Sequence, residues 1–252
     1  MKRTLLKLTA VCLALTLLFS VTAFAAQEDF KPFENSAFFS FGDYDIHYRV
    51  FEAQGAEKGR ILMIHGFLSN TITWEPMVDG LTAAGYTRVL ADMPTFGYST
   101  KESAQVSPIP REDLAVELMR SIAPLDTWIL AGHSMGGGIS MNIATAHPEV
   151  RGMLLYCPMP TSEIPPLLKG IITFKAVGKA MDAFASLATA GRLFGIIALA
   201  FAAWDIRFAL NYDIDKVTGP LSLPGTGTGL TYTTARMQGT DLTAVAALEM
   251  QV

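Results

Sequence analysis

Four short runs of almost continuous apolar residues divide the middle of the chain. Runs of this length, without alternation, are typical of strands that are buried on both faces of a parallel sheet. They cover residues 60–64, 88–91, 128–131 and 152–156. Two alternating runs precede them, at 37–41 and 44–50, and the Gly42-Asp43 pair between the two predicts a tight antiparallel hairpin.

Segments with apolar residues at helical spacing separate these runs. They span residues 74–84, 111–122 and 135–146. Strands that alternate with helices in this way build a parallel sheet through right-handed crossovers, with helices on both of its faces. The pattern therefore predicts an α/β fold of three layers around a mostly parallel sheet.

The pattern changes after residue 160, where strand-like runs give way to helical segments rich in Ala, Phe and Leu. We interpret residues 161–240 as a helical lid inserted over the sheet, interrupted by a loop at 218–229. Residues 183–204 carry a single charge, Arg192, so a membrane-spanning helix is the alternative there. Arg192 and Gly195 in mid-segment favour a pair of short lid helices with apolar inner faces.

The first 25 residues have the pattern of a secretory signal peptide. A basic start precedes the apolar stretch at 5–21, and Ala23-Phe24-Ala25 follows as a small-x-small cleavage site. An uncleaved membrane anchor is the alternative, which the polar residues 27–29 disfavour. We expect a protein that is secreted or periplasmic after cleavage.

Charge and cysteine content narrow the class of protein further. The chain has 19 Lys and Arg against 23 Asp and Glu, and cleavage after residue 25 would remove three of the basic residues. Nucleic acid is excluded as a partner, because binding its phosphates requires a basic surface. Of the two cysteines only Cys157 lies outside the signal peptide, so stability has to come from the core rather than from a disulfide.

A Gly-x-Ser-x-Gly motif lies between the predicted strand at 128–131 and the predicted helix at 135–146. It consists of Gly132-His133-Ser134-Met135-Gly136. Its glycines permit a turn tight enough to hold a serine in a strained conformation, with the hydroxyl exposed above the sheet. Because the residues before and after the motif supply the strand and the helix that this chemistry needs, Ser134 is the candidate nucleophile.

With this motif the chain resembles the alpha/beta-hydrolase family, and further residues carry the resemblance. His65-Gly66-Phe67 is similar to the family's HGx element, and residues 92–99 are similar to its D-x-P-G-x-G-x-S turn, with Thr95 in place of a glycine. Together with the patterns above, the resemblance divides the chain into a signal peptide at 1–25, a hydrolase core at 26–160, a lid at 161–240, and at 241–252 a truncated return to the core. The last strands of the fold would be missing.

The resemblance also implies roles for individual residues. The backbone N–H groups of Phe67 and Met135 form the expected oxyanion hole, which stabilises the charge of an acyl-transfer transition state. His65 is expected to order the loop that carries Phe67. The implied activity is that of a lidded, esterase-like or lipase-like serine hydrolase acting on a small apolar acyl substrate, without metal or organic cofactor. Ester, thioester, amide, peracid and carbon-carbon bond chemistry stay open, as do contact of the lid with a membrane surface and the oligomeric state.

A histidine base for Ser134 is missing from the expected place. The family supplies the acid and the histidine after the nucleophile, but the only later histidine, His147, lies at the far end of the helix, about 20 Å away. We assign His133 to packing, and we expect His47, in the first hairpin, to lie far from the site. Asp241 precedes a helical segment and is expected to cap it rather than to serve as the acid.

These observations lead to two hypotheses. The first is that the chain is an incomplete, inactive fragment of a serine hydrolase, with the acid and the histidine of the triad beyond Val252. The second is a non-catalytic protein of the same fold that binds an apolar ligand or a partner. If the chain ends here in nature, the open edge of its sheet should make it unstable or dependent on a partner.

Overall fold

The computed structural model describes residues 31–160, 164–189, 207, 210 and 213–248. Residues 35–252 form one compact unit, and the segment before residue 35 forms a separate one. All helices and strands named below belong to the larger unit. The predicted signal peptide lies outside the described residues, so it stays a prediction.

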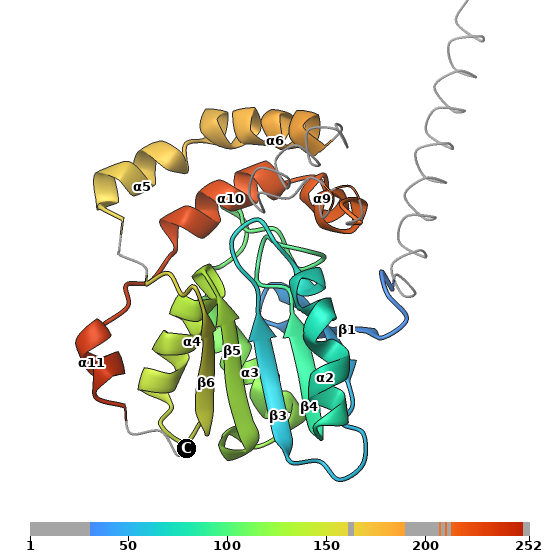
Figure 1. Cartoon of the computed structure of the whole chain (residues 1–252). Coiled ribbons are helices and arrows are strands. Elements are labelled where there is room, and N and C mark those ends of the chain that lie inside the picture. The colour runs from blue at the N-terminus through green and yellow to red at the C-terminus, as the bar shows by residue number, and fades with distance from the viewer. Residues whose placement is uncertain (1–30, 161–163, 190–206, 208–209, 211–212, 249–252) are drawn as a thin grey trace, which may run out of the picture. The chain divides into compact units, whose positions relative to one another are not determined.

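A six-stranded sheet forms the centre of the molecule (Figure 1). Its strands are β1 (Ser36–Phe41), β2 (Tyr44–Phe51), β3 (Gly59–Ile64), β4 (Tyr86–Ala91), β5 (Trp128–His133) and β6 (Gly152–Tyr156). Their order across the sheet is β1-β2-β4-β3-β5-β6. The pairs among β4, β3, β5 and β6 are parallel, and β1 and β2 complete the sheet in antiparallel pairing. The predicted α/β fold with a mostly parallel sheet is confirmed.

The antiparallel pairing of β2 with β4 brings the beginning of one strand beside the end of the other. In the β1–β2 hairpin, Phe41 lies opposite Tyr44, as the predicted two-residue turn requires. In the β2–β4 pair, Tyr48 lies opposite Ala91. His47 therefore lies next to Asp92, at the same edge of the sheet as the carboxyl ends of the parallel strands.

Helices cover both faces of the sheet, and alternate residues of each strand pack against them. On one face, Ile61 and Met63 pack with Trp74 and Val78. On the other face, Leu62 and Ile64 belong to the larger buried cluster, which is built with α3 (Arg111–Ile122) and α4 (Met135–Ala146). The bounds of α3 and α4 are the predicted ones, and the three predicted layers are present.

The predicted helix at 74–84 is the one crossover segment that differs from expectation. The chain forms a 3-10 helix, η1 (Thr71–Met77), followed by the α-helix α2 (Val78–Ala83). Pro76 lies inside η1. Because proline has no backbone N–H to donate and its ring obstructs a continuous α-helix, the regular hydrogen-bond pattern starts only after it. A second short 3-10 helix, η2 (Leu125–Thr127), leads into β5.

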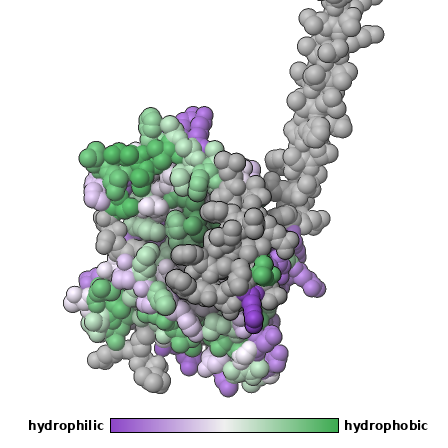
Figure 2. Space-filling model, turned by 45° about the horizontal axis from the view of Figure 1, so that its top comes forward, coloured by the Kyte–Doolittle hydropathy of each residue, from purple (hydrophilic) through white to green (hydrophobic). Residues whose placement is uncertain are grey.

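A helical layer lies beyond the carboxyl ends of the strands (Figure 1). Its described helices are α5 (Pro166–Ile172), α6 (Lys175–Thr189), α9 (Asp215–Leu221) and α10 (Thr226–Ala235). The short α11 (Leu242–Ala246) follows, beside α4. In Figure 2, where the top of the molecule comes forward, hydrophobic side chains gather at the upper left, over the region of α5.

The loop predicted at 218–229 is wrong, because most of that segment is helical. α9 continues to Leu221, and α10 begins at Thr226. Residues 222–225 separate them, and the last of these, Gly225, has a left-handed backbone (φ 83°) and precedes the first residue of α10. Gly, Pro and Thr predict a loop on average, but a single left-handed glycine is sufficient for the turn here.

The membrane-spanning helix weighed for residues 183–204 falls largely on 190–206, outside the described residues. In the part of the chain that the structure describes, no helix combines the length and the hydropathy that crossing a membrane needs.

Candidate active site

Ser134 lies at the sharp turn that joins β5 to α4, with φ 51° and ψ −115°. This backbone conformation is strained for a residue with a side chain, and such strain is concentrated at functional sites. It is the geometry expected of a serine that a strand-turn-helix motif presents at the edge of an α/β sheet. Ser134 is half-buried and caps no backbone N–H of α4 with its side chain.

Backbone hydrogen bonds hold this turn on both sides. The Ser134 N–H donates to the carbonyl oxygen of Tyr156, at the end of β6, over 3.1 Å. The Ser134 carbonyl oxygen accepts hydrogen bonds from the N–H groups of Gly137 (2.9 Å) and Met159 (2.9 Å). The strained residue is therefore fixed by α4 and by the chain that leaves β6.

The loop after β3 lies directly beside Ser134. A Cβ atom added to Gly66 would lie 3.3 Å from Ser134 Cβ and 2.8 Å from His133 Nδ1. In this loop the Ser69 N–H donates to the Gly66 carbonyl oxygen (3.2 Å), and Leu68 has a positive φ of 60°. Phe67 lies inside this turn, and its ring packs edge-on against Phe96 with the ring centroids 5.4 Å apart.

Two backbone donors at this place make no hydrogen bond with the rest of the described chain. They are the N–H groups of Phe67 and Met135, the two predicted members of the oxyanion hole. Met135 is the first residue of α4, where the helix dipole gives the N–H groups a partial positive charge. The two N–H groups thus have no partner within the described chain, and their role as an oxyanion hole stays a prediction.

His65 connects the Phe67 loop to the segment after β4. The Met93 N–H donates to His65 Nε2 over 3.0 Å, so the proton of the ring is on Nδ1. That Nδ1 donates to the Gly66 carbonyl oxygen over 2.7 Å. Burial lowers the pKa of His65, so the ring is neutral and both of its nitrogen atoms are used in ordering the loop. The expected structural role of His65 is confirmed.

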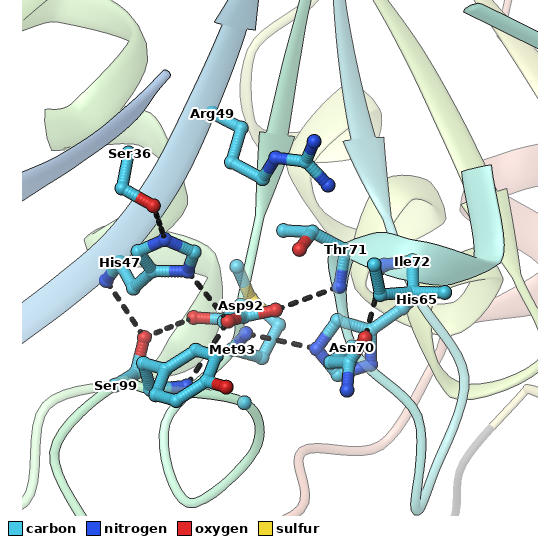
Figure 3. Close-up of polar contacts among 12 residues, drawn as sticks. Ser36, His47, Arg49, His65, Asn70, Thr71, Ile72, Asp92, Met93 and Ser99 are labelled. Atoms are coloured by element: carbon cyan, nitrogen blue, oxygen red, sulfur yellow. Dashed lines mark hydrogen bonds and ion pairs between the residues drawn. The ribbon is translucent and has the colours of Figure 1, made fainter. Parts of the chain in front are cut away.

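Asp92 holds the other end of the same loop (Figure 3). Figure 3 shows its carboxylate between His47 on one side and the Thr71 backbone on the other. Asp92 Oδ1 accepts from the Thr71 N–H (2.7 Å), and Oδ2 accepts from His47 Nδ1 (2.7 Å) and from the Tyr98 N–H (3.0 Å). Burial raises the pKa of Asp92, but the hydrogen bond and charge interaction with His47 outweigh it, so the pKa lies below its usual value.

The expectation that His47 lies far from the strand ends that hold the site is wrong. His47 is fully buried, and its Nε2 lies 2.7 Å from Ser36 Oγ while its Nδ1 donates to Asp92. The reason is topological: β2 is antiparallel to β4, so His47 reaches the edge where Asp92 begins the turn. The sequence pattern of the hairpin does not indicate which strand β2 pairs with, so the approach of His47 to the strand ends could not be expected from it.

Thr95, which replaces a glycine of the family turn, has the left-handed backbone of that glycine (φ 80°). Three hydrogen bonds hold it there. Its N–H donates to the Thr100 carbonyl oxygen (2.8 Å), its hydroxyl accepts from the Glu102 N–H (3.2 Å), and its carbonyl oxygen accepts from Lys101 Nζ (2.9 Å). Burial lowers the pKa of Lys101 to about 8. The turn is therefore preserved in spite of the substitution.

All four histidines of the sequence lie in the described residues, and none of them forms a hydrogen bond with Ser134. His47 and His65 are bonded as described above. His133 Nδ1 is buried without a partner beside Gly66. His147 ends α4 and lies 3.4 Å from Glu149 through Nδ1, as expected of a residue at the helix terminus.

Asp241 caps α11, as predicted. Its Oδ1 accepts hydrogen bonds from the N–H groups of Thr243 (2.9 Å) and Ala244 (3.2 Å). Because these bonds use the carboxylate at the start of a helix, Asp241 is not placed to orient a base for Ser134.

Comparison with known proteins identifies the class to which this fold and site belong. The sequence profile of the alpha/beta hydrolase fold family matches residues 59–196. The chain belongs to this family.

The curated relatives match it over part of their length. A 2-hydroxy-6-oxononadienedioate/2-hydroxy-6-oxononatrienedioate hydrolase of Cupriavidus pinatubonensis is 29% identical over 154 residues, which cover 54% of this chain and 52% of the relative. Esterase Rv0045c of Mycobacterium tuberculosis is 26% identical over 111 residues, which cover 44% of this chain and 36% of the esterase. The chain therefore spans about half, or less, of the length of these relatives.

Solved structures share the fold. A probable hydrolytic enzyme of Pseudomonas aeruginosa PAO1 superposes with a TM-score of 0.62 at 18% identity, covering 85% of this chain and 70% of that one. The epoxide hydrolase CorEH superposes with the same TM-score of 0.62 at 17% identity, covering 85% of this chain and 79% of the other. At such identities the likeness establishes the architecture alone.

Proposed function

We propose that this protein is a serine hydrolase that cleaves a carboxylic ester or a related acyl bond through an acyl-enzyme on Ser134. One observation carries the proposal. Ser134 lies on a strained turn between β5 and α4, beside two backbone N–H groups, those of Phe67 and Met135, that donate to no described residue.

The chemistry follows from this arrangement. Ser134 Oγ attacks the carbonyl carbon of the substrate and gives its proton to a base, and the carbonyl oxygen becomes an oxyanion between the two N–H groups. The base then returns the proton to the leaving alcohol as the tetrahedral intermediate collapses to the acyl-enzyme. Water hydrolyses the acyl-enzyme by the same sequence of steps and restores the Ser134 hydroxyl.

The proposal requires a histidine from outside these 252 residues. His47 and His65 are bonded elsewhere, and His147 lies at the far end of α4. His133 directly precedes Ser134 but forms no hydrogen bond with it. A serine hydroxyl is a poor nucleophile without a neighbouring base, and an acid has to orient that base. We infer that both groups follow residue 252 in the complete protein, and that the 252-residue chain alone turns over substrate poorly.

The relatives support the reaction class. The two curated relatives described above are a hydrolase and an esterase by name, and the chain shares their family. A nucleophilic serine sets this chain apart from hydrolases of this fold that attack with aspartate. We propose a small apolar acyl substrate, taken up under a lid formed by residues 161–240, and action outside the cytoplasm after removal of residues 1–25.

The position of the histidines also favours a second function. A protein of this fold without a base would bind an apolar acyl ligand or a partner at Ser134 and release it unchanged. Sequencing of the gene beyond codon 252 distinguishes the two. An in-frame continuation with an aspartate and a histidine supports the hydrolase, whereas a stop codon supports binding without turnover.

A fluorophosphonate probe tests the hydrolase directly. The product of the whole open reading frame should take up one phosphonyl group on the peptide that contains Ser134, measured by mass spectrometry. Ser134→Ala should abolish labelling, and Ser121→Ala, which changes a serine that bonds only within α3, should not. A folded wild-type protein that stays unlabelled would contradict the proposal.

A further inference from the structure

Large apolar side chains are exposed on α5, on α6 and on one of the two residues that join them. We call this set the α5–α6 patch. Its members, with their exposed fractions, are Leu167 (80%), Leu168 (45%), Ile171 (56%), Phe174 (65%) and Phe184 (62%). They lie on consecutive helices of the layer that is farthest from the sheet (Figure 1), and Figure 2 shows hydrophobic side chains gathered over the α5 region.

The patch is not the surface that holds α6 on the protein. The inner side of α6 already packs against α10 at close range, because a Cβ atom on Gly178 would lie 2.8 Å from Thr228 Oγ1. The Asp182 carboxylate accepts from the Thr228 N–H (2.9 Å) and from its hydroxyl (2.6 Å). The side of α6 that carries Gly178 and Asp182 is therefore occupied by α10, and Phe184 is an exposed residue of a helix that is already docked.

The charges beside the patch are positive. Between residues 164 and 186 the charged side chains are Lys169, Lys175, Lys179 and Asp182, and Asp182 is bonded to Thr228. Lys175 and Lys179 are exposed, lie one helical turn apart, and form no ion pair with another described residue. The whole chain has a net charge of −4, so Lys175 and Lys179 place exposed positive charge on an acidic protein, although α9, which packs against α6, has the exposed Asp215.

Exposed apolar side chains flanked by lysines are the pattern of helices that lie in a membrane interface. The apolar groups enter the boundary between headgroups and acyl chains, and lysines with long apolar stems keep their ammonium groups among the phosphates. An anionic lipid surface can bind both the apolar side chains and the lysines. A neutral lipid surface would bind mainly through the apolar side chains.

We propose that the α5–α6 patch binds an anionic lipid surface, with Lys175 and Lys179 in contact with the headgroups. The proposal does not depend on the chemistry of Ser134. Binding through this patch would turn the helical layer toward the lipid, together with the edge of the sheet at which the parallel strands end.

Vesicle sedimentation tests this inference. Because the apolar stretch at residues 5–21 would bind lipid by itself, the chain is produced from residue 26, which retains the whole compact unit of residues 35–252. We expect it to sediment with vesicles of phosphatidylcholine and phosphatidylglycerol in equal parts, more strongly than with pure phosphatidylcholine. Added salt should weaken this binding, because salt screens the attraction between the lysines and the lipid phosphates.

Two pairs of substitutions separate the contribution of the lysines to vesicle binding from that of the apolar side chains. Lys175→Gln with Lys179→Gln should weaken binding to the anionic vesicles about fivefold for each lysine and leave the weaker binding to neutral vesicles unchanged. Leu167→Ser with Ile171→Ser should reduce binding to both kinds of vesicle. The matched controls Lys58→Gln and Leu242→Ser change exposed residues outside the patch and should bind like the wild type. Circular dichroism verifies that each variant is folded.

Three results would overturn the proposal. The first is a wild-type chain that does not sediment with anionic vesicles. The second is a pair of patch variants that bind as well as the controls do. The third is a change of oligomeric state in the patch variants, measured by sedimentation velocity, without a change in vesicle binding, which would assign the patch to contact between copies of the chain.

Discussion

Gly136 lies where α4 passes closest to β3. A Cβ atom at this position would lie 2.6 Å from the Ile64 carbonyl carbon and 2.7 Å from the His65 carbonyl oxygen, both of them backbone atoms. We therefore predict that Gly136→Ala pushes α4 away from β3 and lowers the free energy of unfolding by about 3 kcal/mol. Urea denaturation of the variant and of the wild type measures the effect.

Gly80 provides the matched control for this substitution. It also lies in a helix, α2, but a Cβ atom there would meet no atom within 4 Å. Gly80→Ala should raise the free energy of unfolding by up to about 1 kcal/mol, because alanine loses less backbone entropy in a helix. Equal effects of the two substitutions would show that the contact between α4 and β3 is not close.

Burial of His65 should make the free energy of unfolding depend on pH. Burial lowers the pKa of His65 in the folded chain, so the unfolded chain binds more protons at this residue below its ordinary pKa of about 6.5. The free energy of unfolding should therefore fall as the pH decreases through that value, by at most about 1.4 kcal/mol per pH unit from this group. Urea denaturation between about pH 7.5 and about pH 5 measures the slope.

Two substitutions test whether the decrease in the free energy of unfolding with falling pH comes from His65. His65→Gln removes the titrating group and should flatten the decrease, although it also weakens the loop at every pH. His147→Gln, which changes a partly exposed histidine at the end of α4, should leave most of the slope in place. If His147→Gln flattens the profile and His65→Gln does not, His65 is not buried in its neutral form.

At the scale of elements, a buried carboxylate attaches α10 to the core. Glu102 is 1% exposed and binds Arg111 of α3, and its carboxylate also has partners in Tyr44 of β2, in α10 and in the residue after α10. The Thr233 hydroxyl donates to Glu102 Oε2 (2.9 Å), and Arg236 Nη1 lies 3.3 Å from Glu102 Oε1. Arg236 Nη2 also donates to the carbonyl oxygen atoms of Ser103 and Val106, at 3.1 Å each.

We predict that Arg236→Met loosens α10. The substitution leaves two carbonyl oxygens and part of a buried carboxylate without their partner, which should cost about 2 kcal/mol. Hydrogen exchange should become faster at the amides of α10 before it does in the sheet. Arg120→Met removes a surface ion pair with Glu117 and should change stability by less than about 1 kcal/mol, so similar effects of both variants would contradict the assigned role.

Sequence patterns predicted those elements whose periodicity is set by burial. The strands β3, β4 and β5 are mostly buried and read as continuous apolar runs, and α3 and α4 have the expected bounds because each packs one face on the sheet. The edge strand β6 has the same kind of run, although it is only partly buried. The pattern failed at η1 and α2, where Pro76 divides the segment, and at α9 and α10, where composition suggested a loop. Both errors come from local backbone geometry that a hydrophobic pattern does not record.

At the scale of the whole molecule, β6 forms an edge of the described sheet, where it pairs with β5 alone. Leu154 of this strand is 42% exposed. Open apolar edge strands promote association between chains, and a charge on the strand opposes it. We predict that Leu154→Lys reduces association of the 252-residue chain in light scattering, whereas Leu242→Lys on α11 does not. Unchanged scattering of Leu154→Lys would show that β6 is not the site of association.

The sequence predicted those parts of the candidate site that lie within one short motif, and missed the contacts between residues far apart in the chain. Ser134, Phe67 and Met135 follow from two short motifs, each at the end of a strand. The contact of His47 with Asp92 depends on the pairing of β2 with β4, which joins residues 45 positions apart. Strand order is a property of the assembled sheet, so the support that His47 and Asp92 give to the Phe67 loop could be recognised only in the structure, whereas that of His65 follows from the local motif.

The central claim is that Ser134 presents its hydroxyl to an oxygen-binding site made by two backbone N–H groups. A crystal structure of the protein after reaction with a fluorophosphonate tests this claim most directly. We predict a phosphorus bonded to Ser134 Oγ and a phosphoryl oxygen about 2.7–3.1 Å from the backbone nitrogens of both Phe67 and Met135. An adduct on another residue, or a phosphoryl oxygen more than about 3.5 Å from both nitrogens, would contradict the account.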